Sequence, residues 1–161
     1  MHILISENSN QYLGAAAGRE TALRSAHNAS IRGIRRFDAF LTRLSKPADV
    51  LLRAVTGLLF AFHGMQGLFG YQIPAEFMPK FGSQGWIGSV IELATGLLVA
   101  AGFFTRWAAF LASGTMAVAY VQFHWKLQFG AHFFPTVNQG EMALLFCLVF
   151  FHFATRGPGR P

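Results

Sequence analysis

Charged residues and cysteine are both scarce in this chain of 161 residues, and each scarcity excludes a class of protein. Charged residues make up 12% of the sequence, about half the share that is usual in soluble domains. The hydrophobic share is 53% and 18 residues are Phe, which indicates an integral membrane protein. The single cysteine, Cys147, excludes an intrachain disulfide and any iron–sulfur or zinc site built on several cysteines.

The positive charge is concentrated near the N-terminus, so the formal charge of +6 does not indicate a nucleic-acid surface. Eight of the 13 Lys and Arg residues lie at or before Arg53, and no basic patch interleaved with aromatic residues follows them. A basic segment beside anionic lipid explains this asymmetry, and we expect no nucleic-acid partner. The sequence also lacks a phosphate-binding loop and a dinucleotide fingerprint.

The residues before the first long apolar run fall into two parts. Residues 1–30 are polar and have no sustained period, which predicts a disordered N-terminal extension rather than a secretory signal. In residues 31–46 apolar side chains recur at helical spacing between arginines, which predicts a short basic amphipathic helix at the cytoplasmic membrane surface. A solvated helix before the first span explains the same pattern.

Four apolar segments follow, each of about 17 to 22 residues, which is the length that a helix needs to cross a bilayer. They cover residues 48–69, 86–104, 106–125 and 139–155, and residues 156–161 form a short tail. The predicted fold is all-α, a four-transmembrane-helix bundle over residues 48–155. Small residues in the spans are expected to allow close helix contacts, namely Gly57, Gly64, Gly88, Gly96, Ala112 and Gly114.

The distribution of positive charge between the loops predicts the orientation. If the N-terminus is in the cytoplasm, the inner side holds the basic tail with Arg106, Arg156 and Arg160. The Lys and Arg residues of the two outer loops are then only Lys80 and Lys126. The positive-inside rule therefore places both termini in the cytoplasm.

This orientation places two ionisable residues at one depth in the outer half of the bundle. His63 lies about six residues, or roughly 9 Å, below the outer end of the first span, and Glu92 of the second span lies at a similar level. Because such groups avoid hydrocarbon, we expect them to face the bundle interior or a wet cavity. Glu92 and His63 are the candidate catalytic residues, since a pair of this kind moves protons. The alternative is a polar clamp that only locks two helices.

Five further polar residues are candidates for binding a ligand. Gln66, His124, Asn138 and Glu141 belong to the same outer half. Asn138 and Glu141 also have a structural explanation, because they begin the fourth helix, where Asn caps and acids favour the dipole. Arg53 lies at the inner end of the first span, where interface anchoring also explains it. We expect neither haem nor a metal site, because no His repeats at a ligand spacing within one helix.

Five motifs occur in order along the apolar part of the chain. R-x-x-x-G and HGMQ-x-LFG lie within residues 53–70, and E-x-x-x-G-LL-x-x-x-G-x-x-TR covers residues 92–106. FFP-x-x-N-x-GE covers residues 133–141, and GPGR follows at residues 157–160. By their order and spacing, the sequence resembles the DoxX family of small four-helix bacterial membrane proteins over about residues 48–161.

The resemblance implies a multi-pass protein of the bacterial inner membrane with a redox-linked role. Family members are associated with quinone-linked oxidation of sulfur compounds and with oxidative-stress complexes. The hypothesis is a redox-associated subunit in which His63, Gln66 and Glu92 hold a quinone head group. A partner protein would carry the flavin, haem or sulfur centre. The alternatives are a non-catalytic assembly or scaffold protein, and a small permease or proton path; a homo-oligomer is compatible with each.

One position departs from the family pattern. The family commonly has a Lys where this chain has Gly67. If that Lys binds an anion or a quinone head group, this chain either uses Gln66 or Arg53 instead or has lost the function.

Overall fold

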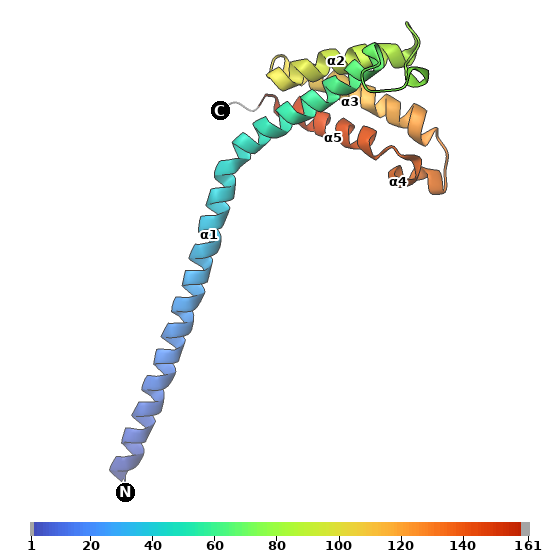
Figure 1. Cartoon of the computed structure of the whole chain (residues 1–161). Coiled ribbons are helices and arrows are strands. Elements are labelled where there is room, and N and C mark those ends of the chain that lie inside the picture. The colour runs from blue at the N-terminus through green and yellow to red at the C-terminus, as the bar shows by residue number, and fades with distance from the viewer. Residues whose placement is uncertain (1, 159–161) are drawn as a thin grey trace. The chain divides into compact units, whose positions relative to one another are not determined.

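The computed structural model describes residues 2–158, with side chains at residues 19, 23–25, 27–28 and 30–158. All regular structure in these residues is helical, as the all-α prediction requires (Figure 1). The α-helices are α1 (His2–Phe69), α2 (Gln84–Ala101), α3 (Thr105–Ala119), α4 (Pro135–Asn138) and α5 (Glu141–Arg156). The shorter elements are η1 (Ala75–Phe77), the π-helical η2 (Tyr120–Trp125) and η3 (Ala131–Phe133).

The chain divides into two compact units, Met1–Ser45 and Lys46–Pro161. In the first unit α1 is continuous from His2, where the sequence predicted a disordered extension followed by a separate amphipathic helix. Residues 2–45 contain no proline, and Ala, Leu, Arg and Glu among them favour a helix. The apolar side chains of the predicted amphipathic segment are exposed, namely Ile34, Phe37, Leu41 and Leu44.

In the second unit α1 and α2 pack with their backbones in contact at glycine positions. An ideal Cβ on Gly57 would lie 2.6 Å from the carbonyl oxygen of Gly96 and from the amide nitrogen of Ala100. One on Gly64 would lie 2.5 Å from the carbonyl oxygen of Ser89. Since real side chains do not approach a backbone so closely, the predicted contact role of Gly57, Gly64 and Gly96 is confirmed.

Phenylalanine rings and alanines fill the core of the second unit. Phe60 of α1 packs against Phe146 and Phe150 of α5, with ring centroids 5.5 and 4.6 Å apart. The α3 helix contacts both α2 and α5, and its Ala109 and Ala112 are fully buried. Four helical segments therefore enclose one core, with α1 against α2 and α5 and with α3 against the same two helices (Figure 1).

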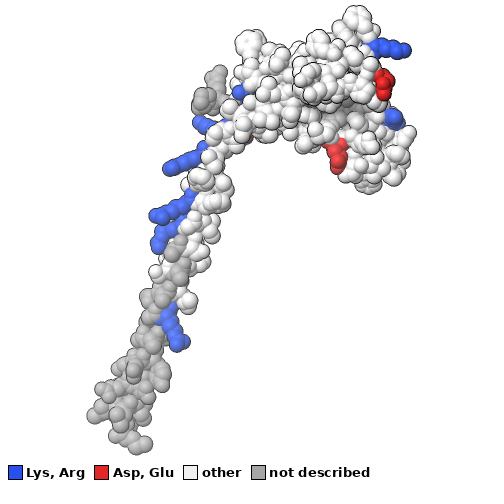
Figure 2. Space-filling view, in the orientation of Figure 1, with Lys and Arg blue, Asp and Glu red and all other residues white. Residues whose placement is uncertain are grey.

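The surface of the second unit is suited to lipid. On the face shown in Figure 2 most of this unit is uncharged. Large apolar side chains are exposed on all four helices, among them Leu58, Leu97, Trp107, Leu111, Leu145, Leu148 and Phe151. Two helical stretches, Leu23–Phe69 and Gln84–Ala101, are long and apolar enough to cross a membrane by length and composition. Extended apolar surface of this kind indicates contact with a membrane.

Arg53 of α1 binds the C-terminal end of α2. Its Nη1 donates to the carbonyl oxygens of Val99 at 2.5 Å and of Ala100 at 3.1 Å. These carbonyls belong to the last turn of α2, where backbone partners are few; the Val99 carbonyl also accepts from the Gly102 amide at 3.1 Å. A cation at this position also interacts favourably with the helix dipole. The interaction explains Arg53 as a structural residue of the α1–α2 pair.

We expect Arg53→Met to lower the free energy of unfolding by about 2 kcal/mol, because a hydrogen bond to a charged group contributes about 1.5–3 kcal/mol. The measurement is denaturant unfolding of the detergent-solubilised protein, followed by circular dichroism. Arg43→Met is the matched control, since Arg43 is exposed. An equal loss in both variants would contradict the role of Arg53 at the end of α2.

Candidate functional site

His63 and Glu92 lie in contact across the α1–α2 interface. Nδ1 of His63 is 4.0 Å from Oε2 of Glu92. The contact agrees with the equal level expected for the two residues, and the close approach at Gly64 brings their side chains together. The separation exceeds a hydrogen bond, and the two groups form an ion pair when the imidazole is protonated. The pair is therefore suited to holding a proton on either group.

The two residues differ in their surroundings. The Glu92 side chain is 15% exposed, whereas the His63 side chain is 68% exposed. His63 is thus exposed on the surface of the unit, whereas the sequence predicted that it faces the interior of the bundle or a wet cavity. The reason is that the inward-facing positions of α1 near this level are occupied by Phe60, which contacts α5, and by Gly64, which contacts α2.

A groove of about 470 Å³ lies between α2 and α3, beside Glu92. Gly85, Gly88 and Glu92 line it from one face of α2, at the helical spacing i, i+3, i+7. Gly114 and Thr115 line it from α3, and most of the remaining wall is apolar. Of the described residues in the lining, only Glu92 is ionisable. A concave apolar site with few polar groups is typical of small-molecule binding.

The prediction that Gly88 and Gly114 make close helix contacts is wrong. A Cβ on either residue would meet no atom within 4 Å. Both glycines face the groove, so their missing side chains leave it open instead of bringing helices together. The sequence contains a pattern that indicates the open face of α2, because Gly85 and Gly88 lie on the same helical face as Glu92.

The π-helical segment η2 forms one end of the groove, and the sequence reasoning missed it. Phe123 of η2 lines the groove together with Gln84 of α2. The Gln84 side-chain amide donates to the side-chain oxygen of Gln122, which joins η2 to the start of α2. Single π-helical turns are frequent at functional sites. The amphipathic pattern of the third span does not distinguish such a turn from an ordinary α-helix.

Two of the candidate binding residues, His124 and Asn138, are also in contact. Nδ1 of His124 lies 3.3 Å from the backbone oxygen of Asn138. The Asn138 side chain bridges its own loop, since its Oδ1 accepts from the Gly140 amide at 2.8 Å and its Nδ2 donates to the His132 carbonyl at 2.9 Å. These bonds account for Asn138 as a residue that holds the connection into α5.

The other candidates are placed as follows. Gln66 is half-buried on α1, one turn after His63, and Glu141 is exposed in the first turn of α5. Arg53 precedes His63 by ten residues, about 15 Å along an α-helix, and it is bound to α2. The described side chains include no group of three or more His, Cys, Asp and Glu residues that could hold a metal ion. The functional roles of all these residues stay predictions.

The position at which a family Lys was expected is closely packed. An ideal Cβ on Gly67 would overlap the hydroxyl of Ser89, which is buried and donates to the carbonyl of Gly85 at 3.0 Å. A longer side chain at this position would have to displace Ser89. Gly67 and Ser89 are therefore matched to each other, and this chain has no room for a lysine there.

Comparison with known proteins assigns the family. The sequence model of the DoxX family matches residues 48–125, which include the α1–α2 contact and the groove. An uncharacterised protein of Haemophilus influenzae is 36% identical over 115 residues, which cover 67% of this chain and 81% of that protein. No solved structure matches the chain significantly. The chain belongs to the DoxX family of membrane proteins.

Proposed function

We propose that this protein is a redox-associated membrane subunit that binds the head group of a quinone in the groove between α2 and α3. The observation that supports this best is the groove itself, which has about 470 Å³ of space, apolar walls and a single carboxyl group. A quinone head group is a flat ring with two carbonyl oxygens. The glycine-lined walls leave space for the ring, and a protonated Glu92 is a donor for one oxygen.

In this proposal the residues of the site bind the quinone and move protons, while electrons come from a partner. Reduction of a quinone to a quinol consumes two electrons and two protons. Glu92 gives one of the two protons to the nearer quinone oxygen and takes a proton back from His63, and the other quinone oxygen takes the second proton from water. A partner protein with a redox centre supplies the electrons.

The membrane arrangement proposed with this function has four spans and both termini in the cytoplasm of a bacterial cell. The distribution of Lys and Arg supports the orientation. The helices α3 and α5 have 15 and 16 residues, fewer than the roughly 20 that a span requires. However, α3 continues directly into η2, so that the helical stretch runs from Thr105 to Trp125 and reaches that length.

Filling the groove tests this proposal. We expect Gly114→Leu to abolish quinone binding with little loss of stability, because the new side chain would enter the groove and meet no atom at its Cβ. The measurement is equilibrium binding of a short-chain quinone to the purified protein in detergent. Gly33→Leu is the matched control, since Gly33 is a helical glycine of the first unit with open surroundings. Unchanged binding by Gly114→Leu would show that the quinone does not occupy this groove.

A non-catalytic scaffold is the second candidate, and the contact between His63 and Glu92 supports it. The contact joins α1 to α2 without requiring a ligand. A scaffold would retain its partner proteins during purification but would bind no quinone. Quinone binding by the wild-type protein therefore separates the two functions.

A further inference from the structure

A second, charged pocket of about 210 Å³ lies where α1 enters the second unit and α5 ends. Its ionisable lining consists of Lys46, Asp49, Arg53, His152 and Arg156. Three of these residues carry a permanent positive charge and one carries a negative charge. The pocket is therefore a concave site with an excess of positive charge, unlike the groove beside Glu92.

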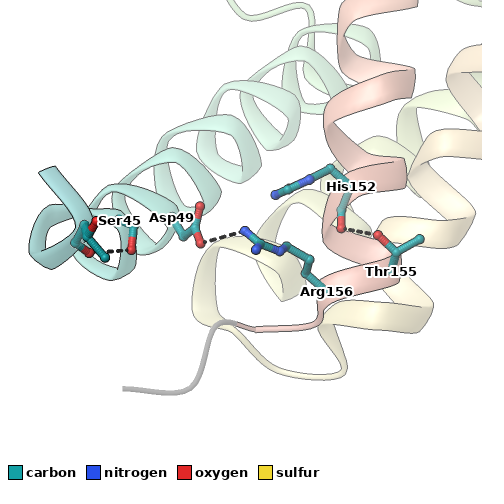
Figure 3. A network of polar contacts seen from close by, with 6 residues as sticks. Ser45, Asp49, His152, Thr155 and Arg156 are labelled. Atoms are coloured by element: carbon teal, nitrogen blue, oxygen red, sulfur yellow. Dashed lines mark hydrogen bonds and ion pairs between the residues drawn. The ribbon is translucent and has the colours of Figure 1, made fainter. Parts of the chain in front are cut away.

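The acid in this pocket does not bind its partner tightly. Nη1 of Arg156 lies 3.3 Å from Oδ2 of Asp49, and the two side chains are 63% and 37% exposed. Exposed ion pairs contribute little to stability, so Arg156 is able to exchange Asp49 for another anion. Figure 3 shows His152 and Arg156 both extending from α5 toward α1, where Asp49 lies. The imidazole and the guanidinium thus face the same space.

Arg53, one of the three cations of the lining, and Arg106, which lies just beyond it, add to the positive field. Arg53 lines the pocket, and its buried Nε has no hydrogen-bond partner among the described residues. Arg106 lies next to Gly157 of the pocket wall, because an ideal Cβ on Gly157 would be 2.9 Å from its Nε. Arg and Lys are the side chains that recognise phosphate in proteins. At about 30 Å³ per water molecule, the pocket has room for a phosphate group and a few waters.

We propose that this pocket binds a phosphate group, held by Lys46, His152 and Arg156. Anionic phospholipids present this group at a membrane surface, and inorganic phosphate presents it in solution. The proposal does not depend on the quinone site, because it concerns different residues and an anionic ligand instead of an uncharged ring.

The test compares two double variants of the full chain in detergent. Lys46→Gln/Arg156→Gln removes two charges from the pocket, and Lys80→Gln/Lys126→Gln removes two from exposed positions outside it. Binding of phosphatidylglycerol and of phosphate-free diacylglycerol is measured by native mass spectrometry. We expect the pocket variant to bind phosphatidylglycerol at least about tenfold more weakly, with the control unchanged. Equal losses in both double variants, or equal binding of the two lipids by the wild-type protein, would overturn the proposal.

Inorganic phosphate then identifies the source of the group. If millimolar phosphate displaces phosphatidylglycerol from the wild-type protein, the pocket also accepts the free anion; if it does not, the lipid headgroup is the ligand. Either result supports a phosphate pocket.

Asp49→Asn is a variant that should strengthen lipid binding instead of weakening it. It removes the carboxylate that competes for Arg156, so we expect tighter binding of phosphatidylglycerol. A carboxylate with a purely structural role would lower stability on removal without any gain in affinity, and this result would count against the proposal.

Discussion

Gly64→Leu is expected to prevent α1 and α2 from packing and to be among the most destabilising single changes in this chain. An ideal Cβ on Gly64 would lie 2.5 Å from the Ser89 carbonyl oxygen and 2.9 Å from the Leu93 Cα. Both are backbone atoms of a helix, which cannot rotate aside as a side chain can. Overpacking alone costs about 1–3 kcal/mol. Because separating the helices would also lose the contacts at Gly57 and Gly96, we expect a loss of at least about 3 kcal/mol.

The measurement is the unfolding midpoint of the purified protein, together with the yield of folded protein from membranes. Gly114→Leu is the matched control for stability, since it places the same side chain at a helical glycine of the same unit that has open surroundings. We expect the control to unfold close to the wild-type midpoint. A Gly64→Leu protein as stable as the control would contradict the close contact between α1 and α2.

Glu92→Gln is expected to weaken quinone binding by about 2- to 10-fold, because it replaces the O–H donor of a neutral acid by a weaker amide donor, and a neutral hydrogen bond contributes about 0.5–1.5 kcal/mol. Glutamine has the same shape as glutamate, so the fold should persist, but an amide neither gives a proton to the quinone nor exchanges one with His63. The 4.0 Å separation from His63 is longer than a hydrogen bond, so we expect the stability to change little.

The measurement is the dissociation constant of a short-chain quinone, with the unfolding midpoint determined on the same sample. Glu76→Gln is the matched control, since Glu76 is exposed in η1 and lies outside the groove. The scaffold function predicts the reverse result, with a lower midpoint and no quinone binding to lose. Unaltered quinone binding by Glu92→Gln would remove Glu92 from the site.

The positions of the helices in the second unit could be predicted from the sequence, because their signals are local. The length of each apolar run places a helix, and short polar or glycine-containing segments end it. For example, Ser83 begins α2, with its hydroxyl accepting from the Trp86 amide at 3.3 Å, and Gly102 ends α2 with φ 78°. Counting residues from such ends also placed His63 level with Glu92, since antiparallel neighbours joined by a short loop share their depth.

The amino-acid sequence does not determine which neighbour each helical face contacts. Periodicity shows that Gly88 and Glu92 share a face, but not that this face borders a groove, whereas the equally small Gly64 and Gly96 lie against backbone. Periodicity also does not predict that His63 is exposed. Nor does it predict that Lys46 and Asp49, at the start of the second unit's sequence, share a pocket with Arg156 near its end. The sequence by itself determined which segments of the second unit form its main helices, their order, and the common level of His63 and Glu92 on α1 and α2. Only the tertiary structure decided which of those residues share a site, because the rotation of each helix about its axis is set by packing against its neighbours rather than by its own sequence.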